Sequence, residues 1–297
     1  MPASWRSALV VLGAAVVCAA GASAEPQASA HLETLMARVG ARVAEYYRRA
    51  QSVICLERST VQPVHANWAA EGFARTVESE LRVEAAAPDG DTPSAANVVR
   101  TVRRVNGRPP VERDLKDRSG CTDPNPLSPE PLAFLLPERQ REYRFTSSRE
   151  GKERNRAAVI VDFLSANRAS RPQLIEDRHG HDDCFDWSGP LASRGRIWID
   201  AETYDVLRIE RHVDGPIDVE VPPRLQRRYS FGPYVVLDRD DQTVRYKPVT
   251  FQDPPEVMLL PSSIESLTIL RAGLQSIRRT DTYSNYRRFL GEGRVVK

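Results

Sequence analysis

The pattern of apolar and polar positions divides the chain into one helical segment and a long series of strands. Over residues 31–50, apolar side chains recur every three or four positions with charged ones between them, which predicts an amphipathic helix. After this segment the period changes to two, and residues 76–85 alternate apolar and charged side chains along their length. The pattern predicts a mainly β (α+β) fold that begins with a helix.

Pairs of strands joined by turn signals account for most of the remaining chain. Residues 98–105 end in Asn106-Gly107, a dipeptide that favours two-residue hairpin turns. The other predicted turns lie at residues 149–152, 201–205, 238–241 and 271–275. Successive hairpins predict a large curved antiparallel sheet or an unclosed β-barrel, with one polar and one apolar face.

A short apolar segment interrupts the strands. Residues 128–136 predict a capped helical turn, with Ser128 as the N-cap and Pro129 at the first helical position. Its large apolar side chains are the candidate ligand-binding residues, namely Leu132, Phe134, Leu135 and Leu136. They form either a lid over an apolar groove or a plug in the core, and the sequence leaves both interpretations open.

The first residues predict export. Arg6 precedes an uninterrupted apolar run over residues 8–20, and Ala22-Ser23-Ala24 places small residues where a signal peptidase cleaves. The run is shorter than the ~20 residues that a spanning helix needs. We therefore expect a signal peptide at residues 1–24 and a single periplasmic or secreted domain at residues 25–297, without a transmembrane segment after cleavage. Lipoprotein processing at Cys18 is disfavoured by the bulky Val17 before it.

Composition narrows the class of protein without naming a reaction. The 297 residues are 41% hydrophobic and 28% charged, a balance typical of a globular chain. Lys and Arg number 42 against 40 Asp and Glu, a net charge of +2. Dedicated nucleic-acid binders usually carry a strong basic excess, so no nucleic-acid partner is expected.

Three cysteines remain after removal of the signal peptide, and three pairings are open. Cys121 and Cys184 lie in loop-like surroundings, whereas Cys55 lies in an apolar strand start that suits a buried free thiol. In an exported protein two of them are expected to pair, and we predict a Cys121–Cys184 disulfide.

Candidate chemistry beyond the disulfide is sparse. His179, His181 and Cys184 lie within one acidic stretch, but zinc ligands normally come from two separate segments or from one helix face, so an ordinary polar loop is the favoured interpretation. The sequence contains no hydrolase elbow, no zinc-protease motif and no nucleotide-binding glycine loop. We therefore expect no cofactor, no metal and no catalytic residues.

Two late segments carry a family resemblance. Residues 195–203, followed by Val206-Leu207-Arg208, resemble the Gly-x-x-Trp-x-Asp-x-x-Thr…Leu-Arg hairpin of the LolA-type periplasmic lipoprotein carriers and the RseB-type sensors. Residues 260–262 and 283–289 also resemble the final strands of these proteins. The resemblance implies an unclosed β-barrel whose concave apolar face is covered by helices, binds acyl chains and carries no catalytic group.

The expected function is non-catalytic binding of an acyl chain, a lipoprotein or another apolar ligand in the cell envelope. A second hypothesis is an interaction or sensor module that docks another envelope protein, and a third is a secreted hydrolase. An apolar pocket between sheet and helix favours the first, an exposed apolar patch the second, and a cleft with converging carboxylates and histidines the third.

Overall fold

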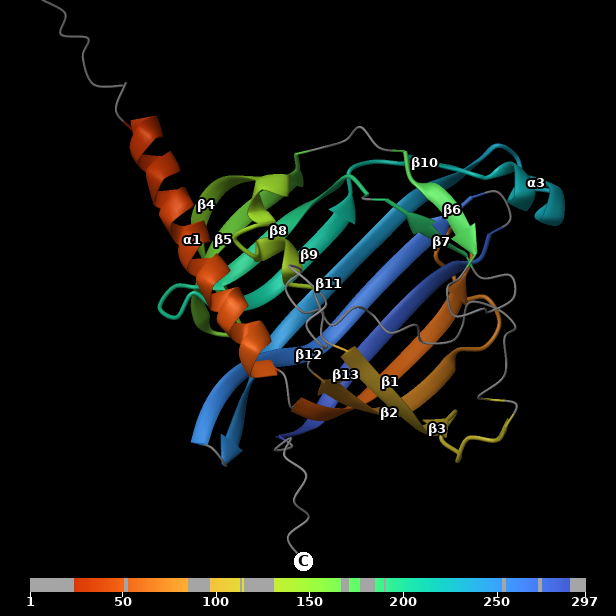
Figure 1. The fold of residues 1–297 in the computed structure, drawn as a ribbon, viewed down its shortest axis with the longest axis horizontal. Helices are drawn as coiled ribbons and strands as arrows, with labels where there is room; N and C mark the ends of the chain where they lie inside the picture. The colour runs from red at the N-terminus through yellow and green to blue at the C-terminus, as the bar shows by residue number, and fades with distance from the viewer. Residues whose placement is uncertain are drawn as a thin grey trace, which may run out of the picture.

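The computed structural model describes residues 24–50, 53–84, 97–112, 114, 131–166, 171–176, 185–189, 191–252, 255–271 and 274–288. Within these residues most of the chain is strand, and one large sheet crosses the molecule (Figure 1). The mainly β fold predicted from the sequence is confirmed. Ser128, Pro129, Cys121, Cys184, His179 and His181 lie outside the described residues.

Thirteen strands form this sheet. They are β1 (Val53–Val64), β2 (Arg75–Glu84), β3 (Asn97–Val105), β4 (Tyr143–Glu153), β5 (Arg156–Ser165), β6 (Gln173–Glu176), β7 (Phe185–Ser188), β8 (Ser193–Asp200), β9 (Val206–Val213), β10 (Ile217–Glu220), β11 (Tyr234–Gln252), β12 (Pro255–Leu270) and β13 (Ser276–Arg288). The main order is β3-β2-β1-β13-β12-β11-β9-β8-β5-β4, and β10, β6 and β7 branch from β11. Strands β3 and β4 end this path without pairing to each other, so the sheet remains unclosed.

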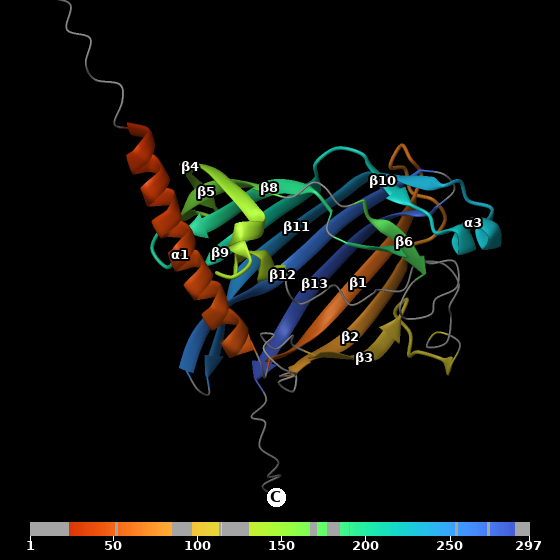
Figure 2. The ribbon, with the colours of Figure 1, turned by 45° about the horizontal axis from the view of Figure 1, so that its top comes forward.

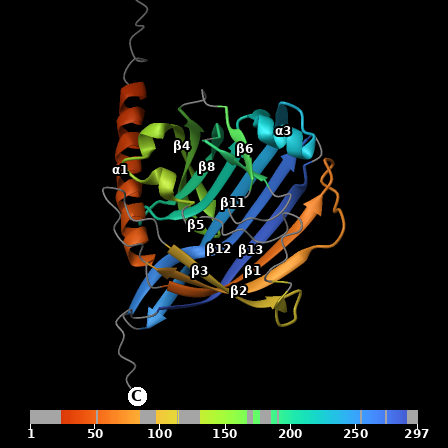
Figure 3. The same cartoon turned by 45° about the vertical axis from the view of Figure 1, so that its right-hand side comes forward.

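The helix α1 (Ala24–Ala50) covers one end of the sheet, as Figures 1 and 3 show. Its buried stripe is Leu35, Met36, Val39 and Val43, the helical spacing seen in the sequence. These side chains share a core with residues of β1, β5, β8, β9, β11, β12 and β13 and with the 3-10 turn η1 (Ala133–Leu135). We call the side of the sheet that faces α1 and η1 the inner face.

A second core lies at the opposite end of the molecule (Figure 2). There β6, β7, β10 and the helix α3 (Pro223–Tyr229) pack around Leu174, Val219, Leu225 and Leu237. The elements predicted from the sequence include no helix over residues 223–229, so α3 was missed. Pro223 at its first turn was the available signal, because proline is well suited to the start of a helix.

One predicted turn forms and one lies at a different place. Asn106 and Gly107 adopt φ of 48° and 79° and reverse the chain after β3, although only Arg108 pairs back with Val105. The prediction of a turn at residues 149–152 was wrong, because this segment belongs to β4. The β4–β5 reversal lies at Arg154-Asn155, with φ of 46° and 67°, and asparagine tolerates this left-handed region better than most residues.

The acidic segment 238–241 was predicted to be a turn and is instead the middle of β11. Neighbouring strands supply a partner for each carboxylate, so the chain can stay extended. Arg271 binds Asp238 at 2.8 Å, Thr268 donates to Asp240 at 2.9 Å, and His212 lies 2.8 Å from Asp241. Because these partners are remote in sequence, local composition could not reveal them.

Candidate functional site

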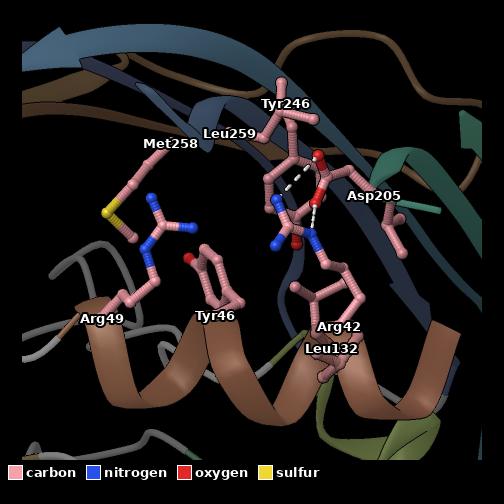
Figure 4. Close-up of a pocket in the computed structure, with 10 residues that line it drawn as sticks. Arg42, Tyr46, Arg49, Leu132, Asp205, Tyr246, Met258 and Leu259 are labelled. Atoms are coloured by element: carbon pink, nitrogen blue, oxygen red, sulfur yellow. Dashed lines mark hydrogen bonds and ion pairs between the residues drawn. The ribbon is translucent and has the colours of Figure 1, made fainter. Parts of the chain in front are cut away.

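A pocket lies on the inner face, between the second half of α1 and the sheet (Figure 4). Its lining residues are Arg42, Val43, Tyr46, Arg49, Leu132, Asp205, Val206, Tyr246, Met258 and Leu259. It has about 410 Å³ of empty volume including the solvent at its mouth, and about 30 Å³ of this can hold the centre of a water molecule. The pocket is therefore narrow.

Arginines of α1 join the helix to the sheet on both sides of the pocket. Arg42 Nε donates to Asp205 Oδ1 at 2.6 Å, and Arg49 Nη2 donates to Glu256 Oε2 at 2.8 Å. The hydrogen bond to Asp205 raises the pKa of Arg42 above its ordinary value, although partial burial opposes this. Glu45 lies between the two arginines, 3.0 Å from Arg42 and 3.6 Å from Arg49. The pocket is thus flanked by charged groups in mutual contact.

The lining of the pocket mixes apolar side chains such as Leu132 and Leu259 with charged groups and tyrosine hydroxyls. Tyr246 is 4% exposed, and its hydroxyl has no hydrogen-bond partner among the described residues. Burial raises the pKa of Tyr246 and of Tyr46, so both hydroxyls stay protonated. An unpaired buried hydroxyl is costly, and a ligand oxygen that accepts from Tyr246 would relieve that cost.

The four side chains predicted to bind a ligand divide between the pocket and the core. Leu132 lines the pocket and is buried beside α1. Leu135 is 0% exposed and belongs to the inner core, while Phe134 and Leu136 are partly buried against that core. The ring of Phe134 packs in tilted contacts against Tyr143 and Phe163, with ring centroids 5.1 and 4.9 Å apart. The segment faces the sheet from its inner side, as both the lid and the plug interpretations require.

The sequence interpretation missed the polar part of this pocket. Arg42, Tyr46 and Arg49 are three and four positions apart on one helix, so a spacing signal existed, but arginines on an amphipathic helix normally face solvent. Asp205 and Tyr246 reach the pocket from β-strands and turns remote in sequence, and no local pattern could assign them.

Other candidate chemistry is limited. Cys55 is a buried free thiol on β1, and burial raises its pKa to about 12, so it is a poor nucleophile. No group of three or more His, Cys, Asp or Glu side chains suited to a metal ion is found where the structure is described.

A second hollow lies on the opposite face of the sheet, lined in part by Asp162, Glu210, His212 and Asp214. These residues alternate along β5, β8 and β9 with inner-core positions such as Ile209. Arginines accompany its acids: Arg196 contacts Asp162 at 3.0 Å, and Arg208 contacts Glu210. Among the residues that the structure describes, those lining the hollow include no serine, threonine or cysteine.

Comparisons with known proteins give a likeness of fold at low identity. No family model and no curated protein matches the chain. A domain from Vibrio parahaemolyticus, named for outer membrane lipoprotein sorting, aligns with a TM-score of 0.37 and 10% identity over 85% of this chain and 93% of its own. A LolA-superfamily protein from Nitrosomonas europaea aligns with a TM-score of 0.31 and 8% identity. The alignment covers 86% of this chain and 93% of that protein.

The MucA/MucB complex of Pseudomonas aeruginosa supplies a further match, with a TM-score of 0.23 and 11% identity over 85% of this chain and 99% of that one. With TM-scores this low, the alignments carry no argument about ligand or partner. Among the described residues, no helix combines the length and apolar character needed to cross a membrane.

Proposed function

We propose that this chain is an exported, non-catalytic binding protein of the cell envelope, whose ligand is an acyl chain, a lipoprotein or another apolar molecule. The ligand lies between α1 and the inner face of the sheet, where the pocket opens when α1 moves. The observation that carries the proposal is the pocket itself, which brings together apolar side chains, charged groups and the unpaired hydroxyl of Tyr246.

The arrangement suits an amphipathic ligand for physical reasons. Val43, Leu132 and Leu259 offer apolar surface from a helix, a turn and a strand, and burying apolar ligand surface there is favourable by ~25 cal/mol per Å². Arg42 and Arg49 can give up their ion pairs with Glu45 and bind the acidic or ester end of a ligand instead, because exposed ion pairs are weak.

Uptake of a fluorescent fatty acid by the purified mature protein tests the proposal. Wild type is expected to bind at micromolar concentration. Leu132→Gln, which adds an amide to the apolar wall, is expected to weaken binding ~10-fold. Val99→Gln is the control, because Val99 is 45% exposed on the edge strand β3. Absence of binding to wild type, or equal loss in both variants, contradicts the proposal.

Leu135→Ala separates a lid from a core plug. Because Leu135 is fully buried, its truncation is expected to lower the free energy of unfolding by about 2–5 kcal/mol if the segment is a plug. A movable lid predicts a smaller loss of stability together with altered uptake of the fatty acid. Chemical denaturation and the uptake assay on the same preparation distinguish these outcomes.

Two exposed aromatic side chains favour docking of another envelope protein as the second candidate function. Phe73 is 97% exposed and Trp68 is 48% exposed in the loop between β1 and β2. Trp68 adopts φ of 69°, stacks under Arg239 at 4.6 Å and accepts a hydrogen bond from Arg278 on its carbonyl. This candidate predicts that the chain binds apolar ligands poorly and that the Phe73→Ala variant no longer binds its partner protein.

A further inference from the structure

The outer face of the sheet, opposite the inner face, is unevenly charged where β3, β2, β1 and β13 run side by side. Inner and outer positions alternate along these strands: Cys55, Glu57 and Ser59 of β1 are buried, whereas Arg58 is exposed on the outer face. The charged outer side chains described on these four strands are Arg58, Arg82, Arg103, Arg104, Arg278, Arg287, Glu78 and Glu80. We call this group the basic patch. Its six arginines and two glutamates give a net charge of +4, whereas the whole chain carries +2.

The two glutamates of the basic patch are shared among its arginines. Glu78 lies 4.0 Å from two of them, and Glu80 lies 3.3 Å from another two. The four arginine side chains in these contacts are between 55% and 64% exposed. Elsewhere on the outer face the charges are better matched, since Arg245 of β11 has Glu265 of β12 at 2.8 Å. The basic patch is therefore a local excess of exposed positive charge, which attracts an anionic partner.

An aromatic loop borders the basic patch. Residues 65–74 join β1 to β2, and within them Phe73 is 97% exposed and Trp68 is 48% exposed. We call this segment the aromatic loop. Arg278 of the basic patch donates to the carbonyl oxygen of Trp68 at 3.2 Å, so the patch and the loop are in direct contact. Figure 3 shows the loop, in orange, at the side of the molecule away from α1.

The aromatic loop is held in a defined conformation. Trp68 adopts φ of 69°, which is unusual for a bulky residue. Its backbone amide donates to the carbonyl of His65 at 2.8 Å, and the amide of His65 donates to the carbonyl of Ala69 at 2.9 Å. The guanidinium of Arg239 lies over the ring of Trp68, 4.6 Å from its centroid. Because these contacts order the loop beforehand, a partner that buries Trp68 and Phe73 restricts little further motion.

The arrangement of charged and aromatic groups differs from that of a usual protein interface. Such interfaces have an apolar core surrounded by a polar rim. Here the aromatic side chains lie at the end of the strands, and paired threonines on the outer face, Thr60, Thr76 and Thr280, separate them from Arg58. Charge spread over a sheet, with aromatic groups at one edge of it, fits the surface of a bilayer better than an acidic protein.

We infer that the basic patch and the aromatic loop together dock the protein on a bilayer that contains anionic phospholipids. Guanidinium groups form charge-assisted hydrogen bonds with lipid phosphates, and tryptophan favours the region between headgroups and acyl chains. Attraction to anionic headgroups and burial of apolar side chains add to each other in such attachment. This inference goes beyond the proposed function and does not depend on the pocket under α1.

Flotation of the purified mature protein with lipid vesicles tests the inference. Wild type is expected to bind vesicles of equal parts phosphatidylcholine and phosphatidylglycerol, but not vesicles of phosphatidylcholine alone. Binding should weaken as salt is added, because salt screens the attraction. Arg103→Gln/Arg104→Gln is expected to weaken binding ~10-fold and to reduce its salt dependence. Phe73→Ser is expected to weaken binding ~10-fold while the salt dependence stays that of wild type.

The matched control is Arg194→Gln/Arg196→Gln, which removes the same charge from the outer face at β8. There Asp214 lies 3.7 Å from Arg194, and Asp162 lies 3.0 Å from Arg196. This control should bind vesicles as wild type does. Uptake of the fluorescent fatty acid should be the same in wild type and in all three variants, so the pocket and the docking surface are tested separately.

Three results would overturn the inference. The first is that wild type does not bind the anionic vesicles; loss of an envelope protein on Phe73→Ala would then favour a protein partner. The second is equal weakening in both arginine variants, which would mean that total charge rather than the basic patch attracts the bilayer. The third is unchanged binding of Phe73→Ser. If Arg103→Gln/Arg104→Gln does not fold, Phe73→Ser decides, because that side chain is almost fully in solvent.

Discussion

At the scale of single residues, the β8–β9 turn shows how one side chain fixes local geometry. Asp200 is buried, and its Oδ1 accepts hydrogen bonds from the backbone amides of Glu202 and Thr203 at 3.0 and 2.8 Å. Burial by itself would raise the pKa of Asp200, but these amides, together with Arg156 at 2.7 Å, lower it below 3.8. The turn also carries Asp205, the partner of Arg42 at the pocket.

Asp200→Ala is expected to lower the free energy of unfolding at neutral pH by about 1–3 kcal/mol, because two turn amides lose their acceptor. A lowered pKa in the folded state means that the charged carboxylate contributes stability above 3.8, and that this contribution is lost as the pH falls through the folded pKa. The difference between wild type and variant should therefore shrink on acidification. Urea denaturation at neutral and acidic pH measures it; a difference that does not change with pH contradicts the assignment.

At the scale of elements, α1 joins the sheet through side chains at defined positions. Its apolar stripe is buried, and Arg42 and Arg49 add charged contacts to Asp205 and Glu256. These contacts are partly exposed, so each is worth little for global stability. They are well placed, however, to keep the helix closed over the pocket.

Arg42→Gln is expected to change the overall free energy of unfolding by less than about 1 kcal/mol while increasing amide hydrogen exchange in α1. Arg58→Gln is the control, since Arg58 is an exposed arginine that contacts only the outer side of the sheet at Glu78. Equal exchange in α1 for wild type and both variants would mean that the apolar stripe alone holds the helix.

Element prediction from sequence succeeded where the determining pattern is local. The stripe of α1 and the β8–β9 and β12–β13 pairs follow from helical spacing and alternation. The misplaced turns have a common cause, because charge at residues 149–152 and 238–241 suggested solvent-exposed turns. In the structure, Arg271 forms an ion pair with the acidic segment and Thr268 donates a hydrogen bond to it, and such pairing is decided by strand order rather than by neighbours in sequence.

At the scale of the whole molecule, the unclosed sheet carries several apolar cores, and buried carboxylates of β1 and β13 interrupt its apolar inner face. The sequence predicted one apolar and one polar face, which holds under α1 but not at Glu57 and Asp281. From sequence alone, a glutamate on an alternating strand is expected to face solvent. Its burial can be predicted only if its counter-charge is known. Arg100, two strands away, was the missing information.

The remaining prediction concerns the link between Cys121 and Cys184, which lie outside the described residues. Cys55 is buried and free, and its pKa is raised to about 12, so it is a poor partner for either of them. A Cys121–Cys184 bond closes a loop of about 60 residues and is expected to add on the order of 4 kcal/mol in the chain-entropy model. Non-reducing peptide mapping of the exported protein should yield one linked pair that contains both cysteines, with Cys55 alkylated only after unfolding. Reduction should lower the melting temperature of wild type but not of the Cys121→Ser/Cys184→Ser double variant. A linked peptide that contains Cys55, or a melting temperature unaffected by reduction, would show that the pairing is wrong.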